Sequence, residues 1–215
     1  MIKIDVVADI VCPWCFIGKR RLESALAIAR RQRPELCVET RWLPFFLNPD
    51  TPSEGEPYLP FLTQKFGSRE AVDALFERVR AAGKHYGIDY SFEKIALRAN
   101  TLAAHRLIHW AQQRGNAAPL VERLLAAQFQ LGEAVGDLAT LTRIASECGY
   151  PEAEVATYLN SDRDTATVRN LERKARALGI NMVPTFIVND DRVIVGAEDP
   201  TILAEAILSC LDAHP

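Results

Sequence analysis

The sequence predicts an α/β protein in which strands and helices at the two ends of the chain enclose a large all-helical region. Three observations lead to this fold class. An apolar run that is typical of a buried strand is followed directly by a Cys-x-x-Cys motif and a helical pattern. A segment rich in proline, glycine and acidic residues, 48–60, separates this start from a long stretch of helical patterns. The chain then ends with two strand patterns and one more helix.

The N-terminal elements begin with residues 2–8, which are mostly isoleucine and valine and indicate a strand buried on both faces. The helical pattern begins after Val11 and stops before Pro34, because proline cannot continue a helix. A second strand is predicted within residues 36–47, where polar and apolar side chains alternate until Pro44. The order strand, helix, strand predicts a right-handed connection between two parallel strands.

Capping residues and glycines mark the starts and ends of the helices that follow. A polar capping residue precedes most of the apolar faces, and a proline opens the others. The predicted helices run from Ser68 to about Gly87, from Asn100 or Thr101 to Gly115, from Pro119 to Gly132, from Asp137 to Gly149, from Pro151 to about Leu159, and from Ser161 or Asp162 to Gly179.

The C-terminal part returns to strand patterns. Residues 183–188 and 192–196 are separated by the turn sequence Asn189-Asp190-Asp191, which predicts a hairpin. Asp199 and Pro200 mark the start of a final helix.

The Cys-Pro-Trp-Cys motif is the candidate active site. Cys12 falls at the N-cap of the predicted helix and Pro13 at its first position, where a missing N–H costs nothing. The partial positive charge of a helix N-terminus would stabilise a thiolate at Cys12. Cys15 lies one turn further on, within reach of a mixed disulfide formed at Cys12. Strand, motif and helix in this order indicate thiol–disulfide chemistry.

A zinc site is the alternative interpretation of a Cys-x-x-Cys motif, and it would need a second pair of ligands. Cys37, Cys148 and Cys210 each stand alone, and we interpret all three as small buried apolar residues. His105 and His109 share one helix face but have no third ligand in sequence. The sequence therefore predicts no metal site.

Composition and charge argue against several classes of partner. The chain has 215 residues, of which 48 % are apolar and 25 % charged, and its net charge is −3. No electrostatic case exists for nucleic acid or a membrane surface, and no apolar run approaches the ~20 residues of a membrane helix. The first residues do not resemble a signal peptide. We therefore expect a cytoplasmic protein, where a disulfide is catalytic more often than structural.

Four segments of the chain carry a resemblance to a known family, namely Asp9–Gly18, Pro44–Pro49, Asn100–Leu107 and Val183–Phe186. They resemble the DsbA family of oxidoreductases and, within it, the FrnE-like branch. The resemblance spans nearly the whole chain and implies a thioredoxin-like fold with a large all-helical insertion. On this basis, we expect a discontinuous thioredoxin-like domain of residues 1–50 and 162–215. The helical insertion domain is expected to span residues 51–161.

The resemblance also implies a function, that of a thiol–disulfide oxidoreductase whose catalytic residues are Cys12 and Cys15. It implies that the bond before Pro184 is cis and that this proline faces the cysteines. Together with Val183, it would hold an extended substrate segment in the manner of an added strand. The other substrate-binding residues expected here are Pro13, Trp14, Asn48 and His105.

One position departs from the family pattern. Val6 stands where thioredoxin and DsbA carry a buried acid in the strand. Asp9, acting through a water molecule, is the candidate substitute for proton transfer to Cys15.

Kappa-class glutathione transferases and 2-hydroxychromene-2-carboxylate isomerases, which resemble this architecture, define the alternative function. They carry a serine at the position of Cys12 and bind glutathione along the backbone before the cis proline. Asn48, Val183 and the pair Glu198-Asp199 are the candidates for such a site here. A resolving cysteine is superfluous for conjugation, so Cys15 argues against this alternative.

The expected partners follow from the chemistry. Substrates would be protein or small-molecule thiols and disulfides, and no resident cofactor is expected. Glutathione is a candidate co-substrate, and glutathione or thioredoxin is a candidate for recycling the cysteines. A homodimer is a further expectation, because many relatives pair. The sequence does not decide whether the protein oxidises, reduces or isomerises its substrates.

Overall fold

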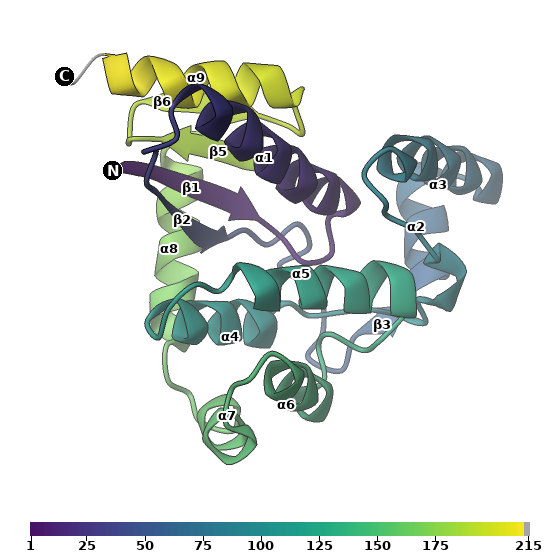
Figure 1. Ribbon diagram of the computed structural model, residues 1–215. Coiled ribbons are helices and arrows are strands. Elements are labelled where there is room, and N and C mark those ends of the chain that lie inside the picture. Colours follow the sequence, from purple (N-terminus) through teal and green to yellow (C-terminus); the bar gives the residue numbers. More distant parts are fainter. Residues whose placement is uncertain (213–215) are drawn as a thin grey trace.

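The structure, a computed structural model that describes residues 1–212, is built around a four-stranded mixed sheet (Figure 1). β1 runs parallel to β2 and antiparallel to β5, and β5 forms the predicted hairpin with β6. The predicted parallel pairing of the first two strands is therefore confirmed. In the order in which they lie in the sheet, the strands are β2 (Val38–Pro44), β1 (Ile2–Ala8), β5 (Thr185–Val188) and β6 (Arg192–Val195).

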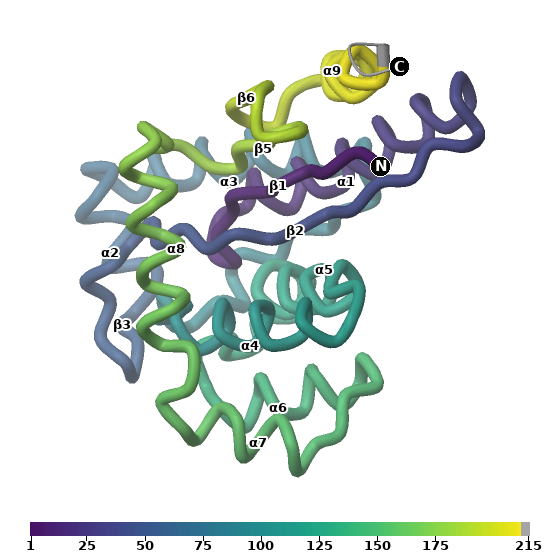
Figure 2. Tube along the Cα trace, turned by 90° about the vertical axis from the view of Figure 1, so that its left-hand side faces the viewer, coloured from purple at the N-terminus to yellow at the C-terminus, as the bar shows by residue number. Residues whose placement is uncertain are grey.

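The central strand β1 supplies side chains to two cores, because successive residues of a strand point to opposite faces. Ile4 and Val6 belong to the main core, together with side chains of α1 (Pro13–Gln32) and α9 (Pro200–Asp212). Val7 joins a smaller cluster that includes a residue of α8 (Thr165–Ala177). Figures 1 and 2 show α8 on the opposite side of the sheet from α1. The predicted burial of both faces of β1 is confirmed.

Helices fill most of the chain between β2 and β5, as predicted. Figure 1 shows α4 to α7 grouped beyond the β2 edge of the sheet, with α2 and α3 as a separate pair. The helices and turns of this region are α2 (Tyr58–Phe66), α3 (Arg69–Lys84), η1 (Phe92–Lys94), α4 (Leu102–Gln112), α5 (Ala118–Ala126), the π-helical turn η2 (Ala127–Leu131), α6 (Leu138–Glu147) and α7 (Glu152–Leu159).

A two-stranded ladder adds to the expected helices, where β3 (Glu56–Pro57) pairs antiparallel with β4 (Leu97–Arg98). The division of the chain into the domains 1–50 with 162–215 and 51–161 stays a prediction. No helix within the described residues is long and apolar enough to cross a membrane.

Helix α2 corrects the sequence prediction, which treated residues 48–60 as a loop. Pro57 precedes the helix and Pro60 lies in its first turn. Proline is tolerated there because the first N–H groups of a helix have no intrahelical partner. Gly67, with φ of 92°, closes the helix in the left-handed conformation that glycine adopts without cost.

The start of α8 also differs from the prediction. Asp164 precedes the helix, and neither Ser161 nor Asp162 caps it. The Ser161 hydroxyl donates to the carbonyl of Tyr158, and the Asp162 carbonyl accepts from the N–H of Thr165. These two residues therefore form the turn between α7 and α8. By contrast, the predicted caps Ser68 and Asp137 are confirmed by their side-chain bonds to backbone N–H groups.

The three isolated cysteines were predicted to be buried, and this prediction is wrong for Cys37. Cys210 is buried, Cys148 is half-buried and Cys37 is exposed. Cys37 follows the buried Leu36 at the start of the edge strand β2, so its side chain points away from the core.

Ion pairs tie α1 to α5. Lys19 is only 3 % exposed, and its Nζ lies 2.5 Å from Glu23 and 2.7 Å from Glu122. Arg20 pairs with the same Glu122 carboxylate. A buried cation needs such partners, since an unpaired buried charge is strongly destabilising. The helix that carries the cysteines is therefore fixed against a helix of the insertion.

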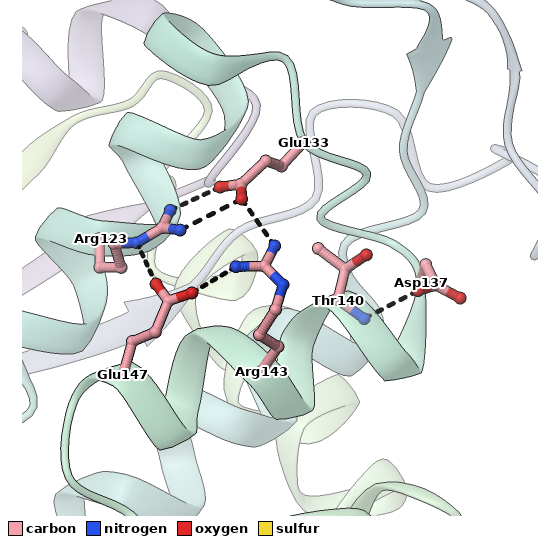
Figure 3. A network of polar contacts seen from close by, with 6 residues as sticks. All are labelled: Arg123, Glu133, Asp137, Thr140, Arg143 and Glu147. Atoms are coloured by element: carbon pink, nitrogen blue, oxygen red, sulfur yellow. Dashed lines mark hydrogen bonds and ion pairs between the residues drawn. The ribbon is translucent and has the colours of Figure 1, made fainter.

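A second polar network joins α5 to α6 (Figure 3). Arg123 donates to Glu133 at 2.5 Å and to Glu147 at 2.8 Å. Arg143 donates to the same two carboxylates. These bonds hold the pKa values of Glu133 and Glu147 below their usual range, and the hydrogen bond from Arg123 is the main cause for both carboxyl groups.

This network predicts a loss of stability in acid. A carboxyl whose pKa is lowered by folding stabilises the native state above its unfolded pKa, about 4.3 for glutamate, and loses that contribution as pH falls through the lowered value. Glu133→Gln is therefore expected to lower the free energy of unfolding at pH 7 by less than about 1 kcal/mol, with a smaller difference from wild type at pH 3. Urea unfolding at both pH values measures this. An equal deficit at the two pH values, or a matching loss in the exposed-site control Glu152→Gln, would contradict it.

Candidate active site

Cys12 lies where β1 ends and α1 begins. It is the N-cap residue of α1, with extended backbone angles, and Pro13 is the first helical residue, as predicted. The Cys12 N–H donates to the Asp9 carbonyl at 3.1 Å, and the Cys12 carbonyl accepts from the Cys15 N–H at 3.0 Å. Main-chain bonds therefore fix this turn and place the Cys12 sulfur at the positive end of the helix.

The loop before β5 meets this turn. The Cys12 thiol donates to the Val183 carbonyl oxygen over a distance of 3.6 Å. The Val183–Pro184 peptide bond is cis, as the resemblance implies. The fold thus brings together the first cysteine and the predicted Val183-Pro184 pair from opposite ends of the chain.

Gly18, one turn after the motif, permits this close approach of α1 to the loop. A Cβ atom there would lie 2.6 Å from Pro184 Cγ and 3.2 Å from Phe186 Cζ. Gly18→Ala is therefore expected to lower the free energy of unfolding by about 1–3 kcal/mol, the cost typical of overpacking, measured by urea denaturation. Alanine has the higher helix propensity, so an unchanged or raised stability would contradict the close packing.

Cys15 lies in the core behind Cys12 and is 1 % exposed, against 5 % for Cys12. Burial is the main cause that raises the pKa of the Cys15 thiol well above its ordinary value. The hydrogen bond with Cys12 and the charges of Cys12 and Asp9 raise this pKa further, whereas a backbone bond from Asp9 lowers it. Cys15 is therefore protonated near neutral pH and must lose a proton before it can attack a disulfide.

Asp9 and His105 form a buried polar pair beside Cys15. Asp9 Oδ1 lies 3.2 Å from His105 Nε2, and Asp9 Oδ2 accepts the N–H of Leu47 at 2.8 Å. The two side chains and Cys15 line one cavity of about 10 Å³, with Trp42 among its other walls. This volume is about what one water molecule requires. The pairing joins residues 96 apart and was not predicted.

His105 and Trp14 were expected to bind substrate, and these roles stay predictions. His105 is 5 % exposed and belongs to the buried pair with Asp9. Trp14 is half-buried and packs against the main core. His109 contacts Gln113 instead of sharing a partner with His105.

Asn48 was also expected to bind substrate. Its carbonyl accepts from the N–H and hydroxyl of Thr51, and its Oδ1 lies 3.4 Å from Lys65 Nζ. Among the described residues, no hydrogen bond joins Asn48 to the cysteine turn, and its role in substrate binding stays a prediction.

Tyr90 is a site residue that the sequence analysis missed. It lies between α3 and η1, and its hydroxyl donates to the Pro13 carbonyl oxygen at 2.6 Å. The two residues are 77 positions apart, and no motif marks Tyr90. Only the packing of the insertion against α1 reveals this contact.

Known proteins are similar to this chain in sequence and in fold. The chain is 27 % identical over 211 residues to the uncharacterised protein YwbO of Bacillus subtilis, with 96 % of each chain covered. Its structure is similar to that of the probable DsbA oxidoreductase SCO1869 from Streptomyces coelicolor, with a TM-score of 0.89, 28 % identity and coverage of 100 % of this chain and 92 % of the other.

A more distant similarity is to the cytosolic disulfide reductase DsbM from Pseudomonas aeruginosa, solved with GSH. The TM-score is 0.64 at 14 % identity, with 98 % of each chain covered, so this similarity shows the fold alone. The family model of the DSBA-like thioredoxin domain matches residues 3–208. The chain therefore belongs to the DSBA-like thioredoxin family.

Proposed function

We propose that this protein is a thiol–disulfide oxidoreductase that uses the dithiol of Cys12 and Cys15. One observation carries the proposal: Cys12 lies at the N-terminus of α1 with its sulfur 3.6 Å from the Val183 carbonyl, and Cys15 lies buried behind it. The first position suits a nucleophilic thiolate, and the second suits a resolving thiol that acts only from within the protein.

In the reducing direction, the Cys12 thiolate attacks one sulfur of a substrate disulfide. The substrate S–S bond breaks, one substrate thiolate leaves, and a mixed disulfide with Cys12 forms. Cys15 then loses its proton and attacks the Cys12 sulfur, which forms the Cys12–Cys15 bond and releases the second substrate thiolate. The oxidising direction is the reverse of these steps.

Asp9 is the proposed acceptor of the Cys15 proton. Its carboxylate lies in the same cavity as Cys15 and is held in place by Leu47 and His105. The cavity volume of about 10 Å³ is close to the minimum for one water molecule, which in this proposal carries the proton between them. Asp9 would thus replace the acid that is absent at Val6.

Substrates in this proposal are protein or small-molecule disulfides, and the site of action is the cytoplasm. DsbM, which shares the fold, is named a cytosolic disulfide reductase, and this name supports the proposed location. A homodimer and membership of the FrnE-like branch stay predictions.

Glutathione is the second candidate, as co-substrate or as substrate of a transferase or isomerase. DsbM was solved with GSH, which favours a test here. Asp199, one of the residues considered for a glutathione site, accepts hydrogen bonds from the N–H and the hydroxyl of Thr201 at the start of α9. Titration with S-methyl glutathione, which cannot form a disulfide, separates the alternatives, because tight binding would favour the transferase or isomerase.

The test of the leading proposal is the reduction potential of the Cys12–Cys15 pair in glutathione buffers, followed by Trp14 fluorescence with Trp14→Phe as the control for the other tryptophans. A potential of about −120 to −180 mV would indicate an oxidase or isomerase, and one near about −270 mV a reductase. A stable mixed disulfide with glutathione and no intramolecular bond would contradict the dithiol mechanism.

A further inference from the structure

Tyr90 connects the helical insertion to the redox motif through a single hydrogen bond. Its hydroxyl donates to the carbonyl of Pro13, the residue directly after Cys12, at 2.6 Å. Tyr90 is 3 % exposed, so water does not compete freely for this bond. A carbonyl oxygen has two lone pairs and can accept this bond in addition to one within α1.

The Tyr90 ring is held at the end of a stack of four aromatic rings. Tyr90 stacks on Phe92 with ring centroids 5.1 Å apart, Phe92 on Phe76 at 4.2 Å, and Phe76 on Tyr58 at 6.3 Å. Phe16 of α1 packs against Tyr90 in a T-shaped arrangement, with ring centroids 6.2 Å apart. The hydroxyl is therefore aimed at Pro13 by packing that involves both the insertion and α1.

Gly83 of α3 leaves the space that the Tyr90 ring occupies. A Cβ atom at Gly83 would lie 2.4 Å from Tyr90 Cε2. Any side chain at this position would push the ring and with it the hydroxyl. The contact with Pro13 thus depends on α3 as well as on Tyr90 itself.

The Tyr90 hydroxyl remains a neutral hydrogen-bond donor near neutral pH. Burial is the main cause that raises the pKa of Tyr90 far above its usual range, and the charges of Cys12 and Cys15 add to it. The Tyr90 hydroxyl therefore stays protonated near neutral pH and can donate to the Pro13 carbonyl.

We propose that Tyr90 is a positioning residue of the redox site, and that it couples the packing of the insertion to the redox state of Cys12 and Cys15. The inference rests on the proposed function. The bond to Pro13 is present with both cysteines as free thiols, and in this inference it stabilises the reduced turn more than the oxidised turn. Formation of the Cys12–Cys15 bond pulls the two sulfurs together and moves the turn that Tyr90 holds. By linkage, reduction of the pair then tightens the packing of α3 and the aromatic stack on α1.

The first experiment compares wild type with Tyr90→Phe, which keeps the ring and removes the hydroxyl. The reaction is the exchange of the two thiols with glutathione disulfide, which yields the Cys12–Cys15 disulfide and two glutathione thiols. Loss of one buried hydrogen bond from the reduced form is expected to shift this equilibrium about 2- to 10-fold toward the protein disulfide. Tyr58→Phe, at the far end of the same stack, is the matched control and is expected to leave it within about 2-fold.

A second readout separates positioning from a general loss of stability. The thermal midpoints of the reduced and oxidised forms are measured for each variant. Tyr90→Phe is expected to lower the midpoint of the reduced form more than that of the oxidised form, whereas Tyr58→Phe is expected to lower both equally. Gly83→Ala, which displaces the ring but keeps the hydroxyl, is expected to act in the same direction as Tyr90→Phe.

An exchange equilibrium in Tyr90→Phe equal to that of Tyr58→Phe would overturn the inference, as would equal losses in the two redox forms. The proposed function is tested separately by turnover of a protein disulfide. The proposed function alone would be overturned if wild type formed the Cys12–Cys15 disulfide but did not turn over substrate, while Tyr90→Phe still showed the expected shift of the exchange equilibrium. A pair that never forms a disulfide would overturn both.

Discussion

Replacement of Cys12 by serine is expected to abolish thiol–disulfide exchange, with turnover of a protein disulfide lowered by at least about a thousandfold. The reason is chemical: a serine hydroxyl is not ionised at neutral pH and cannot form a disulfide. Cys12 also has the position of the nucleophile, at the N-terminus of α1 and next to the Val183 carbonyl. Turnover is measured with insulin or a model peptide disulfide in the presence of excess reductant.

Cys15→Ser is the informative partner of this variant. It keeps the first attack and removes the resolving thiol, so a mixed disulfide between Cys12 and the substrate is expected to accumulate and to be visible by mass spectrometry. Cys37→Ser is the matched control, because Cys37 is exposed but lies at the start of the edge strand. Full activity in Cys12→Ser, or a substrate adduct on Cys37 instead of Cys12, would contradict the proposed roles.

Replacement of Asp9 by asparagine is expected to slow the Cys15 step by about 100-fold or more near neutral pH, the usual contribution of a positioned proton acceptor. Burial keeps the pKa of Cys15 well above its ordinary value, so this thiol needs help to lose its proton. Without the carboxylate, the proton must leave to solvent, and the rate then rises with pH. The deficit is therefore largest at neutral pH and shrinks as the solution becomes alkaline.

The measurement is a single-turnover experiment. A mixed disulfide is formed at Cys12, and its decay is followed by stopped-flow fluorescence between about pH 6 and 10. This pH range spans the ordinary ionisation of a thiol. Asp5→Asn is the matched control, because Asp5 is also a buried aspartate of the same chain segment but pairs with Arg41. The same pH profile in Asp9→Asn as in wild type would exclude Asp9 as the acceptor, even if the variant were less stable.

Much of the fold is encoded in local sequence patterns. The apolar run of β1, the proline-limited helix α1 and the caps Ser68 and Asp137 were predicted, because each depends on residues close in sequence. The errors have local causes too. Prolines opened α2 where they were expected to break the chain, and capping residues formed a turn before α8.

For the redox motif, local pattern was enough to predict thiol–disulfide chemistry, because Cys12 falls at a helix N-cap and Cys15 one turn later, and the family resemblance points to Pro184. The groups that surround the two sulfurs could be identified only from the folded chain. Asp9 meets His105 across 96 residues, and Pro13 meets Tyr90 across 77. Neither contact has a sequence signature, since a hydrogen bond between distant residues depends on how buried helices pack, and packing is fixed by the whole core and not by any one segment.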